Sequence, residues 1–359
     1  MTLPDFDHEH VATVVGPRSG ATMTVALHSS RLGPALGGCR LWNYDTWLDG
    51  VTDALRLSSA MTLKNAAAGL DVGGGKSVIA LRPGETLDPD RRRAALLDLG
   101  DLVEELDGRY RTAEDVGTTE HDMVVVAERT RHVVGLPAHN GGSGEPAGDT
   151  ALGVHSGIAA TLDVLGTPGI EGTTITISGL GQVGGRLAHQ LAASGARLVL
   201  ADVNPARKSV ADELGARWVS VDEALVTPAD VFVPAGLGGV LTDEVIDALA
   251  VRAVVGPANN ALAGREGAAR LAARGILYAP DFVVNAGGVI YLTMAAEGAS
   301  RRAIDERVRG IGDTLRLAYR DAGLRGITPL EAAEELAAAR IAAGPVRSAA
   351  EAHIVRSAN

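Results

Sequence analysis

The stretch TITISGLGQVGGRLAHQLAASGARLVLAD, residues 174–202, decides the fold. It begins as an apolar strand and continues into a turn in which Gly179, Gly181 and Gly184 have the spacing G-x-G-x-x-G. A helical pattern follows over residues 186–193, and a second apolar strand ends at Asp202. This order of strand, glycine turn, helix and strand predicts the first βαβ unit of a Rossmann fold, a doubly wound parallel sheet.

The same turn predicts a dinucleotide site. Glycines allow a tight turn and let a pyrophosphate approach the start of the helix, where the helix dipole favours negative charge. Asp202 follows at roughly the 20-residue spacing expected of a carboxylate that holds the ribose hydroxyls. A carboxylate there repels a 2′-phosphate, which favours NAD, although nearby Arg207 keeps NADP open. The alternative to a dinucleotide site is a glycine turn that binds no cofactor. The expected cofactor contacts are Gly179, Gly181, Gln182, Val183, Gly184 and Asp202.

Strand and helix patterns continue on both sides of this unit. Six short strands alternate with helices from residue 173 to residue 278, as in a parallel doubly wound sheet. Before them, residues 135–148 are rich in Gly, Pro, Asn and Ser, which is typical of a hinge, and Asp149 is expected to cap a helix over residues 150–165. The prediction is an α/β protein with a substrate domain at residues 1–140 and a Rossmann domain at 141–359. We expect the helices after about residue 301 to pack back across the junction.

Composition limits the class of protein. The chain has 359 residues, enough for two domains, and its net charge of −11 argues against nucleic-acid binding. Cys39 is the only cysteine, so no internal disulfide forms, and a reducing compartment is expected. The sequence has no signal-peptide pattern and no apolar run of the ~20 residues that a membrane helix needs. We expect a cytoplasmic protein with no membrane partner and no metal site.

Two lysines and one aspartate of the N-terminal part are candidate catalytic residues. Lys64 lies in an apolar helical segment, and Lys76 follows three glycines, at residues 73–75, before a strand expected at residues 78–81. Glycines let a backbone closely approach a small substrate, and two neighbouring, partly buried amines lose protons more easily, as a general base requires. Asp115, after another strand, can supply a carboxylate for proton transfer. The alternative is that these lysines are merely solvated.

Asparagines follow two strands of the predicted Rossmann sheet. Asn259 and Asn260 come after the fifth strand, and Asn285 comes after the sixth. Ligands of such sheets bind beyond the carboxyl ends of the strands, where these amides can orient a nicotinamide or a reacting amino group. Ordinary turn chemistry is the alternative explanation.

Seven ordered segments together resemble the family of glutamate, leucine, phenylalanine and valine dehydrogenases. They cover almost the whole chain and are residues 32–40, 61–64 and 73–76, the surroundings of Asp115, and residues 179–184, 258–260 and 285–288. The resemblance implies NAD-dependent oxidative deamination of an L-amino acid to a 2-oxo acid and ammonia. It also implies catalysis in a cleft between the two domains and a homo-oligomer.

The resemblance assigns a role to each candidate residue. Lys64, helped by backbone near Gly38, would bind the substrate carboxylate, and Lys76 would activate the water that attacks the imine. Asp115 would shuttle protons between the amino group and solvent. Thr150 and Asn259 would position the nicotinamide and the substrate amine.

Three positions indicate the substrate side chain. Leu36 stands where glutamate-specific relatives have a lysine, which excludes glutamate, because an unpaired carboxylate is costly to bury. Ala113, where aromatic-specific relatives tend to have glycine, and Val289 favour leucine, valine or isoleucine over phenylalanine. His155 and the stretch at residues 291–297 depart from the branched-chain pattern, so an aromatic substrate remains the alternative.

Two other kinds of protein fit less well. A hydroxy-acid dehydrogenase usually needs a histidine paired with a carboxylate, and it would leave both lysines unexplained. A noncatalytic NAD-sensing protein need not retain Lys76 and Asp115, yet both are present.

Overall fold

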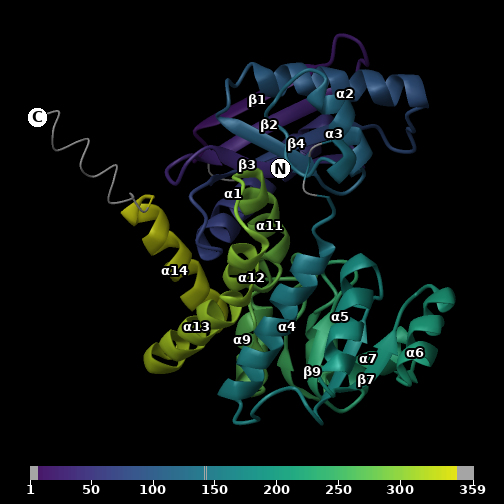
Figure 1. Ribbon diagram of the computed structural model, residues 1–359, viewed down its shortest axis with the longest axis vertical. Coiled ribbons are helices and arrows are strands. Elements are labelled where there is room, and N and C mark those ends of the chain that lie inside the picture. Colours follow the sequence, from purple (N-terminus) through teal and green to yellow (C-terminus); the bar gives the residue numbers. More distant parts are fainter. Residues whose placement is uncertain (1–6, 141, 143, 346–359) are drawn as a thin grey trace, which may run out of the picture. The chain divides into compact units, whose positions relative to one another are not determined.

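The computed structural model describes residues 7–140, 142 and 144–345. They divide into two compact units, each with its own sheet (Figure 1). One unit comprises the described residues up to Gly144 together with those from Ala337 onward, and the other is Glu145–Leu336. Within these described ranges, no helix has the length and apolar character needed to cross a membrane.

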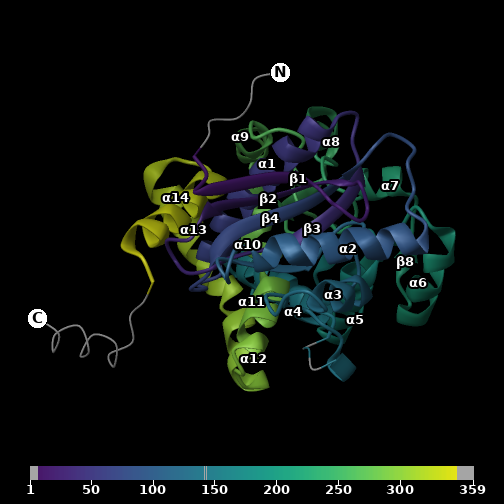
Figure 2. The same cartoon turned by 90° about the horizontal axis from the view of Figure 1, so that it is seen from above.

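The first unit contains a five-stranded sheet whose strand order is β1-β2-β4-β3-β5. Figure 2 labels its first four strands in this order. Neighbours pair antiparallel from β1 to β4, whereas β3 runs parallel to both β4 and β5. The strands are β1 (His10–Val15), β2 (Thr22–Ser29), β3 (Ala35–Asn43), β4 (Gly73–Leu81) and β5 (Tyr110–Glu114). The strand expected at residues 78–81 is therefore longer, and Lys76 lies inside it instead of before it.

Helices cover both faces of this sheet. On one face α1 (Trp47–Ala67) packs on β2 and β4 through Ala54 and Leu55. On the other face, α2 (Pro89–Glu104) and α3 (Glu120–Ala127) close the main apolar core, whose largest fully buried members include Met23, Leu27, Ile79, Leu96, Leu99, Tyr110 and Met123. The short helix η1 (Ala138–Asn140) follows near the end of the unit.

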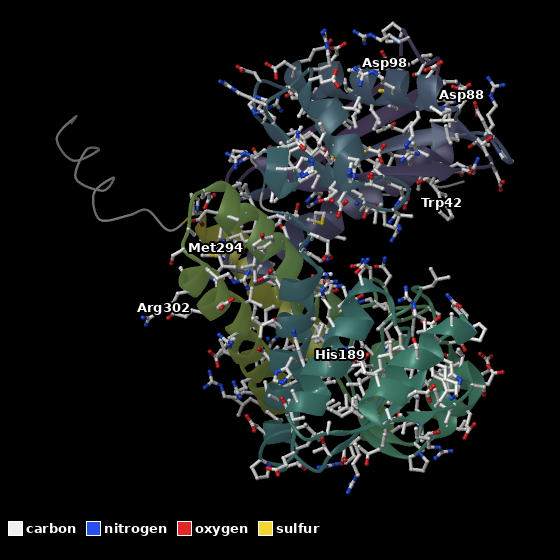
Figure 3. The ribbon with its side chains drawn as sticks, turned by 45° about the vertical axis from the view of Figure 1, so that its right-hand side comes forward. Trp42, Asp88, Asp98, His189, Met294 and Arg302 are labelled. Carbon is white, nitrogen blue, oxygen red and sulfur yellow. The ribbon has the colours of Figure 1, made fainter. Side chains whose placement is uncertain are left out.

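Two aspartates of the α2 segment have structural roles (Figure 3). Asp88 caps the helix by accepting a hydrogen bond from the Arg91 backbone, as its position before Pro89 suggests. Asp98 is buried and accepts hydrogen bonds from the backbone N–H and the hydroxyl of Ser19, at 2.9 and 2.8 Å, and from Arg18 Nη1 at 2.7 Å. Asp98 thus ties the β1–β2 turn to α2.

The second unit contains a six-stranded parallel sheet in the order β11-β10-β9-β6-β7-β8. The chain starts in the middle at β6, winds outward to β8, and then returns to the other side, which is the doubly wound order expected of a Rossmann fold. The strands are β6 (Thr174–Ser178), β7 (Arg197–Ala201), β8 (Arg217–Trp218), β9 (Ala229–Pro234), β10 (Val251–Val254) and β11 (Leu277–Tyr278). The six strands expected from the sequence, at residues 173–178, 198–202, 218–219, 231–234, 253–256 and 276–278, are confirmed to within two residues at each end.

The helices of this unit alternate with its strands and then continue as a C-terminal group. They are α4 (Ala147–Val164), α5 (Gln182–Ala193), η2 (Pro205–Arg207), α6 (Lys208–Leu214), α7 (Val221–Val226), α8 (Asp243–Ala248), α9 (Gly267–Ala273), α10 (Asp281–Val284), α11 (Gly287–Ala296), α12 (Arg301–Arg309) and α13 (Ile311–Arg325). Both α12 and α13 pack on α4. The last helix, α14 (Pro329–Ala343), starts in this unit, and Ala337 packs on Leu32 and Ala66 of the first.

The expectation that Asp149 caps the connecting helix is wrong. Helix α4 begins earlier, after Pro146, without a side-chain cap, so Asp149 lies inside the first turn. Its buried carboxylate forms a two-pronged ion pair with Arg301 of α12, in which Nη1 and Oδ2 are 3.1 Å apart. The carboxylate therefore joins two helices, while its position in the first turn also suits the helix dipole.

Replacing Asp98 should destabilise the first unit. Asp98→Ala removes the acceptor for four donors, two on Arg18 and two on the buried Ser19, and should lower the free energy of unfolding by about 3 kcal/mol. Asp101→Ala is the matched control, because Asp101 also contacts Arg18 but is one-third exposed, and it should cost less than about 1 kcal/mol. Urea unfolding of both variants measures the difference; equal losses would contradict the role given to Asp98.

Candidate active site

Three parallel strands of the first unit place the predicted substrate residues on one face of its sheet. In the register of β3 with β5, Gly38 pairs with Ala113, and Leu36 pairs with Arg111, two residues earlier on β5. Neighbouring residues in a sheet point the same way and alternate along each strand, so Leu36, Gly38 and Ala113 share a face. Leu36 and Ala113 are buried, which makes this part of the face apolar.

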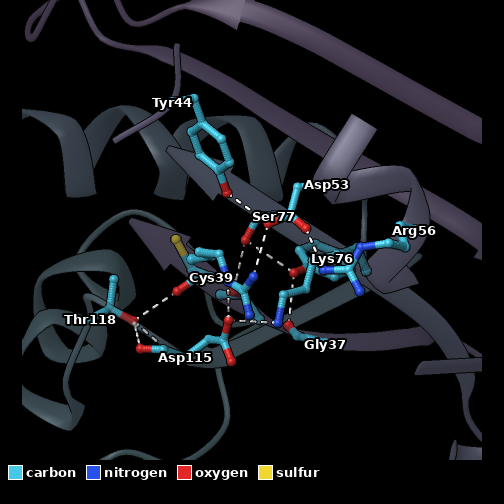
Figure 4. Close-up of polar contacts among 12 residues, drawn as sticks. Gly37, Cys39, Tyr44, Asp53, Arg56, Lys76, Ser77, Asp115 and Thr118 are labelled. Carbon is cyan, nitrogen blue, oxygen red and sulfur yellow. Dashed lines mark hydrogen bonds and ion pairs between the residues drawn. The ribbon is translucent and has the colours of Figure 1, made fainter. Parts of the chain in front are cut away.

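The two candidate catalytic residues contact each other. Lys76 Nζ lies 2.9 Å from Asp115 Oδ2, and the side chains are only 5% and 22% exposed (Figure 4). Burial raises the pKa of the Asp115 carboxyl group, whereas the positive charges of Lys76 and Arg40 lower it by more. Its pKa therefore lies below the usual value. The pair is thus a partly enclosed amine and carboxylate in direct contact, and a ligand beside them could exchange a proton with either group.

The backbone around Asp115 is fixed by a hydroxyl. Thr118 Oγ1 accepts a hydrogen bond from the Asp115 N–H at 3.0 Å and donates to the carbonyl of Cys39, 2.8 Å away, on the neighbouring strand. The loop after β5 is therefore tied to β3, and the carboxylate is held at the edge of the sheet.

Glycine is required at several positions here because chain segments approach closely. A Cβ at Gly38 would lie 2.8 Å from the Asp115 Cβ, and one at Gly74 would lie 2.1 Å from the Thr62 hydroxyl of α1. A Cβ added at Gly75 would lie 2.8 Å from the ring of Tyr110. The expectation that the three glycines before Lys76 make room for a substrate is therefore wrong: they make room for the protein's own helix and core.

Lys64 lies on α1, the helix that packs on β4. It is half-buried in the last turn of the helix, and its neighbour Asn65 donates a hydrogen bond of 2.6 Å to the carbonyl of Gly73 at the start of β4. The end of α1 is thus fixed to the strand that carries Lys76.

Cys39 of β3 is completely buried. Burial raises the pKa of its thiol to about 12, so Cys39 is not a nucleophile.

The second unit contains the glycine turn, and each of its glycines has a different environment. A Cβ at Gly179, where φ is +107°, would lie 2.6 Å from the Ala235 backbone, and one at Gly184 would lie 2.0 Å from the Gly179 carbonyl. At Gly181, in contrast, a Cβ would have no described atom within 4 Å. Helix α5 begins directly after Gly181, with neither a side-chain cap nor an acidic first turn. This turn thus fits a pyrophosphate, because the uncapped N–H groups and the helix dipole favour an anion there.

Asp202 lies beside this turn, as its spacing predicts. Its carboxylate accepts hydrogen bonds from the backbone N–H groups of Leu180, at 2.6 Å, and Asn204, at 2.7 Å. These contacts hold the carboxylate at the end of β7, where ribose hydroxyls are expected. Arg207 lines a surface pocket of about 470 Å³ together with Leu180 and Gly181.

The asparagines beyond the fifth and sixth strands form a pair. Asn285 Nδ2 donates to Asn259 Oδ1 at 2.8 Å and to the carbonyl of Pro257 at 3.2 Å. Asn285 Oδ1 is buried and has no hydrogen-bond partner among the described residues, so it can accept a hydrogen bond from a ligand. An amide such as nicotinamide's carboxamide offers that donor.

The remaining predicted residues also belong to this unit. Thr150 lies in the first turn of α4, and its hydroxyl is close to α11, because a Cβ added at Gly288 would lie 2.8 Å from it. Val289, the residue after Gly288 on α11, is half-buried. His155 instead contacts Ser194 of α5, at 2.9 Å. Lys76, Asp115, Leu36, Gly38 and Ala113 thus lie in one unit, and the cofactor candidates lie in the other.

Arg40 was missed in the sequence. Its Nε lies 3.1 Å from Asp115 Oδ2, and its Nη1 lies 2.9 Å from Asp53 Oδ2 on α1. The alternation of β3 was the available signal, because Arg40 is two residues beyond Gly38 and so lies on the same face.

The chain is similar to known proteins over most of its length. Residues 13–132 match the family profile described as Glu/Leu/Phe/Val dehydrogenase, dimerisation domain, and residues 200–344 match that of Glutamate/Leucine/Phenylalanine/Valine dehydrogenase. Leucine dehydrogenase from Thermoactinomyces intermedius is 39% identical over 341 residues, 94% of this chain and 92% of that protein. Phenylalanine dehydrogenase from Bacillus thermotolerans is 38% identical over 344 residues, 94% of this chain and 89% of that protein.

A solved structure gives the same result. The crystal structure of L-tryptophan dehydrogenase from Nostoc punctiforme superposes with a TM-score of 0.81 and 34% sequence identity, and the match covers 93% of this chain and 96% of that one. The chain is therefore a member of the glutamate, leucine, phenylalanine and valine dehydrogenase family, the amino-acid dehydrogenases.

Proposed function

We propose that this enzyme catalyses the reversible, NAD-dependent oxidative deamination of an L-amino acid with an apolar side chain, with leucine, valine and isoleucine preferred. The products are the 2-oxo acid, ammonia and NADH. The observation that carries the proposal is the Lys76–Asp115 pair on the sheet face that also presents buried Leu36 and Ala113. The similarity to leucine and phenylalanine dehydrogenases supports the same class of substrate.

Each polar group of the first unit has a step in this reaction. Lys64, with backbone near Gly38, binds the substrate carboxylate, and Asp115 accepts a proton from the substrate amino group. The chemistry that NAD supplies when bound is acceptance of a hydride from the α-carbon. Lys76, in its neutral form, then takes a proton from the water that attacks the resulting imine, and Asp115 returns a proton to the departing ammonia.

The second unit would hold the dinucleotide. Gly179, Gly181 and Gly184, with the N–H groups of Gln182 and Val183, would receive the pyrophosphate, and Asp202 would accept hydrogen bonds from the ribose hydroxyls. Thr150, Asn259 and Asn285 would hold the nicotinamide end, where Asn285 Oδ1 has an unused acceptor. We also expect a homo-oligomer, because the matched N-terminal profile is described as a dimerisation domain.

The side chain of the substrate is expected to be aliphatic. Leu36 is 3% exposed and offers no cation to a substrate carboxylate, so glutamate should give no measurable turnover. Ala113→Gly should raise the activity on phenylalanine relative to leucine, because it removes a methyl group worth about 1–3 kcal/mol of discrimination. A panel of amino acids, assayed through NADH formation at alkaline pH with wild type and variant, measures both. A tenfold lead of phenylalanine or tryptophan in the wild type would instead assign an aromatic substrate.

The cofactor preference should depend on Asp202. Two backbone N–H groups hold the Asp202 carboxylate in place, and its negative charge repels a 2′-phosphate, so we expect a strong preference for NAD over NADP. Asp202→Ala should raise the KM for NAD and narrow the preference. Lys208→Ala is the matched control: Lys208 is an exposed cation of the same segment, it pairs with Asp212, and its loss should leave NAD use unchanged. Equal use of both cofactors by the wild type would overturn this assignment.

The two lysines should give different kinetic effects. Lys76→Ala should lower kcat by about 10²–10⁴-fold, because a general base is lost, while NAD binding, followed by fluorescence titration, persists. Lys64→Ala should mainly raise the KM for the amino acid, because a carboxylate anchor is lost. Steady-state kinetics separate the two effects, and near-normal turnover of Lys76→Ala would refute the mechanism.

A further inference from the structure

Two cations share one oxygen of the proposed proton-shuttling carboxylate. Lys76 Nζ lies 2.9 Å and Arg40 Nε lies 3.1 Å from Asp115 Oδ2. Both contacts use Oδ2, so neither cation contacts the other carboxylate oxygen, Oδ1. Two fixed donors from different strands, β3 and β4, allow the carboxylate much less rotation than one donor would.

Arg40 is itself held on its other side. Its Nη1 lies 2.9 Å from Asp53 Oδ2, the oxygen that also accepts the Tyr44 hydroxyl at 2.8 Å, and Arg56 Nη2 lies 2.7 Å from Asp53 Oδ1 (Figure 4). Arg40 and Asp53 are 21% and 14% exposed, so solvent screens this pair less than it screens the surface pairs. The guanidinium thus bridges two carboxylates with two of its nitrogens, which a lysine in the same place cannot do.

Charges alternate in sign along this chain of contacts. The groups that face Asp115 or hold its partner are Lys76 from β4, Arg40 and the neutral thiol of Cys39 from β3, Asp53 and Arg56 from α1, and the Tyr44 phenol. Burial raises the pKa of Asp53, and Tyr44, Arg56 and Arg40 lower it below its usual value, so the anchor stays ionised. Burial also raises the pKa of the Tyr44 phenol, which stays a neutral donor.

We propose that Arg40, anchored by Asp53, is a positioning residue for the deamination: it holds Asp115 so that Oδ1 remains available to the substrate amino group, and it eases release of the Lys76 proton. This inference rests on the proposed function, because it presupposes that Asp115 and Lys76 move the protons. Both effects follow from one contact. The positive charge of Arg40 partly neutralises the carboxylate at Oδ2. The attraction between the carboxylate and the Lys76 ammonium is therefore weaker than in an isolated pair.

Two substitutions of Arg40 separate charge from geometry. Arg40→Gln removes the cation, so the Lys76 ammonium is held more tightly, and the pH at which kcat/KM reaches half of its maximum should rise by about one unit. The kcat should fall by up to about 100-fold, because Asp115 is no longer held in place. Arg40→Lys keeps the charge but cannot bridge, so kcat should fall while the midpoint pH stays near that of the wild type.

Asp53→Asn tests the anchor. It leaves the Arg40 charge less neutralised, so the midpoint pH should not rise, while kcat should still fall because the guanidinium is less well held. Arg93→Gln is the matched control: Arg93 forms a surface pair with Glu128 in the same unit, and its loss should change neither quantity. The thermal midpoint of each variant shows whether it is folded at the assay temperature.

The outcomes are decisive for the positioning role. A higher midpoint pH in Arg40→Gln, but not in Arg40→Lys or Asp53→Asn, supports it. If Arg40→Gln keeps the wild-type midpoint pH, the positioning role is overturned. This holds whether kcat is unchanged or falls together with the thermal midpoint, as it would if Arg40 were purely structural.

Failure of the proposed function is recognised separately. If wild type shows no turnover with any amino acid, or Lys76→Ala keeps its turnover, the function or its mechanism fails. The contact of Arg40 with Asp115 is then still tested by ¹³C NMR titration of the Asp115 carboxyl group, whose midpoint should rise in Arg40→Gln and not in Arg93→Gln. An unchanged midpoint in Arg40→Gln overturns the inference without reference to activity.

Discussion

The close approach of backbone segments at glycine is the constraint on which both units depend. In the first unit, β3 meets β4 where a Cβ on Gly37 would lie only 1.7 Å from the Gly75 carbonyl, and α1 meets β4 at Gly74. No side chain larger than hydrogen fits at these points. Strand β4, which carries Lys76, can therefore lie close to β3 and under the helix that carries Lys64, and Asp115 follows β5 on the other side of β3. Functional groups far apart in the sequence are brought together in this way.

The same constraint acts differently in the second unit. Two of the three glycines in its turn, Gly179 and Gly184, are required by contacts within the chain, and Gly181 alone faces open space. A motif that reads as three equivalent glycines in the sequence therefore consists of two structural positions and one position available to a ligand. With few aromatic side chains, 3% of the residues, the cores rely on aliphatic groups and on this close packing.

Much of the fold could be predicted from the sequence because its signals are local. Strand and helix periodicity located all six Rossmann strands, and Asp88 followed by Pro89 is the usual residue pattern of a helix start, which Asp88 indeed caps. The predictions that failed depended on tertiary contacts. Asp149 has the residue type of a cap, but Arg301 binds it from a helix about 150 residues away. The glycines before Lys76 resemble a ligand-binding loop, but their neighbours are Thr62 and Tyr110, which are distant in the sequence.

The candidate site shows the same division. Strand alternation alone is enough to place Leu36, Gly38 and Arg40 on one face, whereas the partnership of Arg40 with Asp53 needs the docking of α1 on the sheet, which no local pattern encodes. Residue type suggested that Asn285 binds a ligand, but only the structure reveals that one of its two amide atoms is already used by Asn259 and Pro257.

The inaccessible thiol of Cys39 has a practical consequence. It is the only cysteine in the chain, it is completely buried, and its thiolate is scarce at neutral pH, so maleimide reagents have no native target in the folded protein. A cysteine introduced on either unit would therefore react alone. Fluorophores attached to one such position in each unit, without any need to delete a native residue, would report how the distance between the units responds to amino acid and dinucleotide.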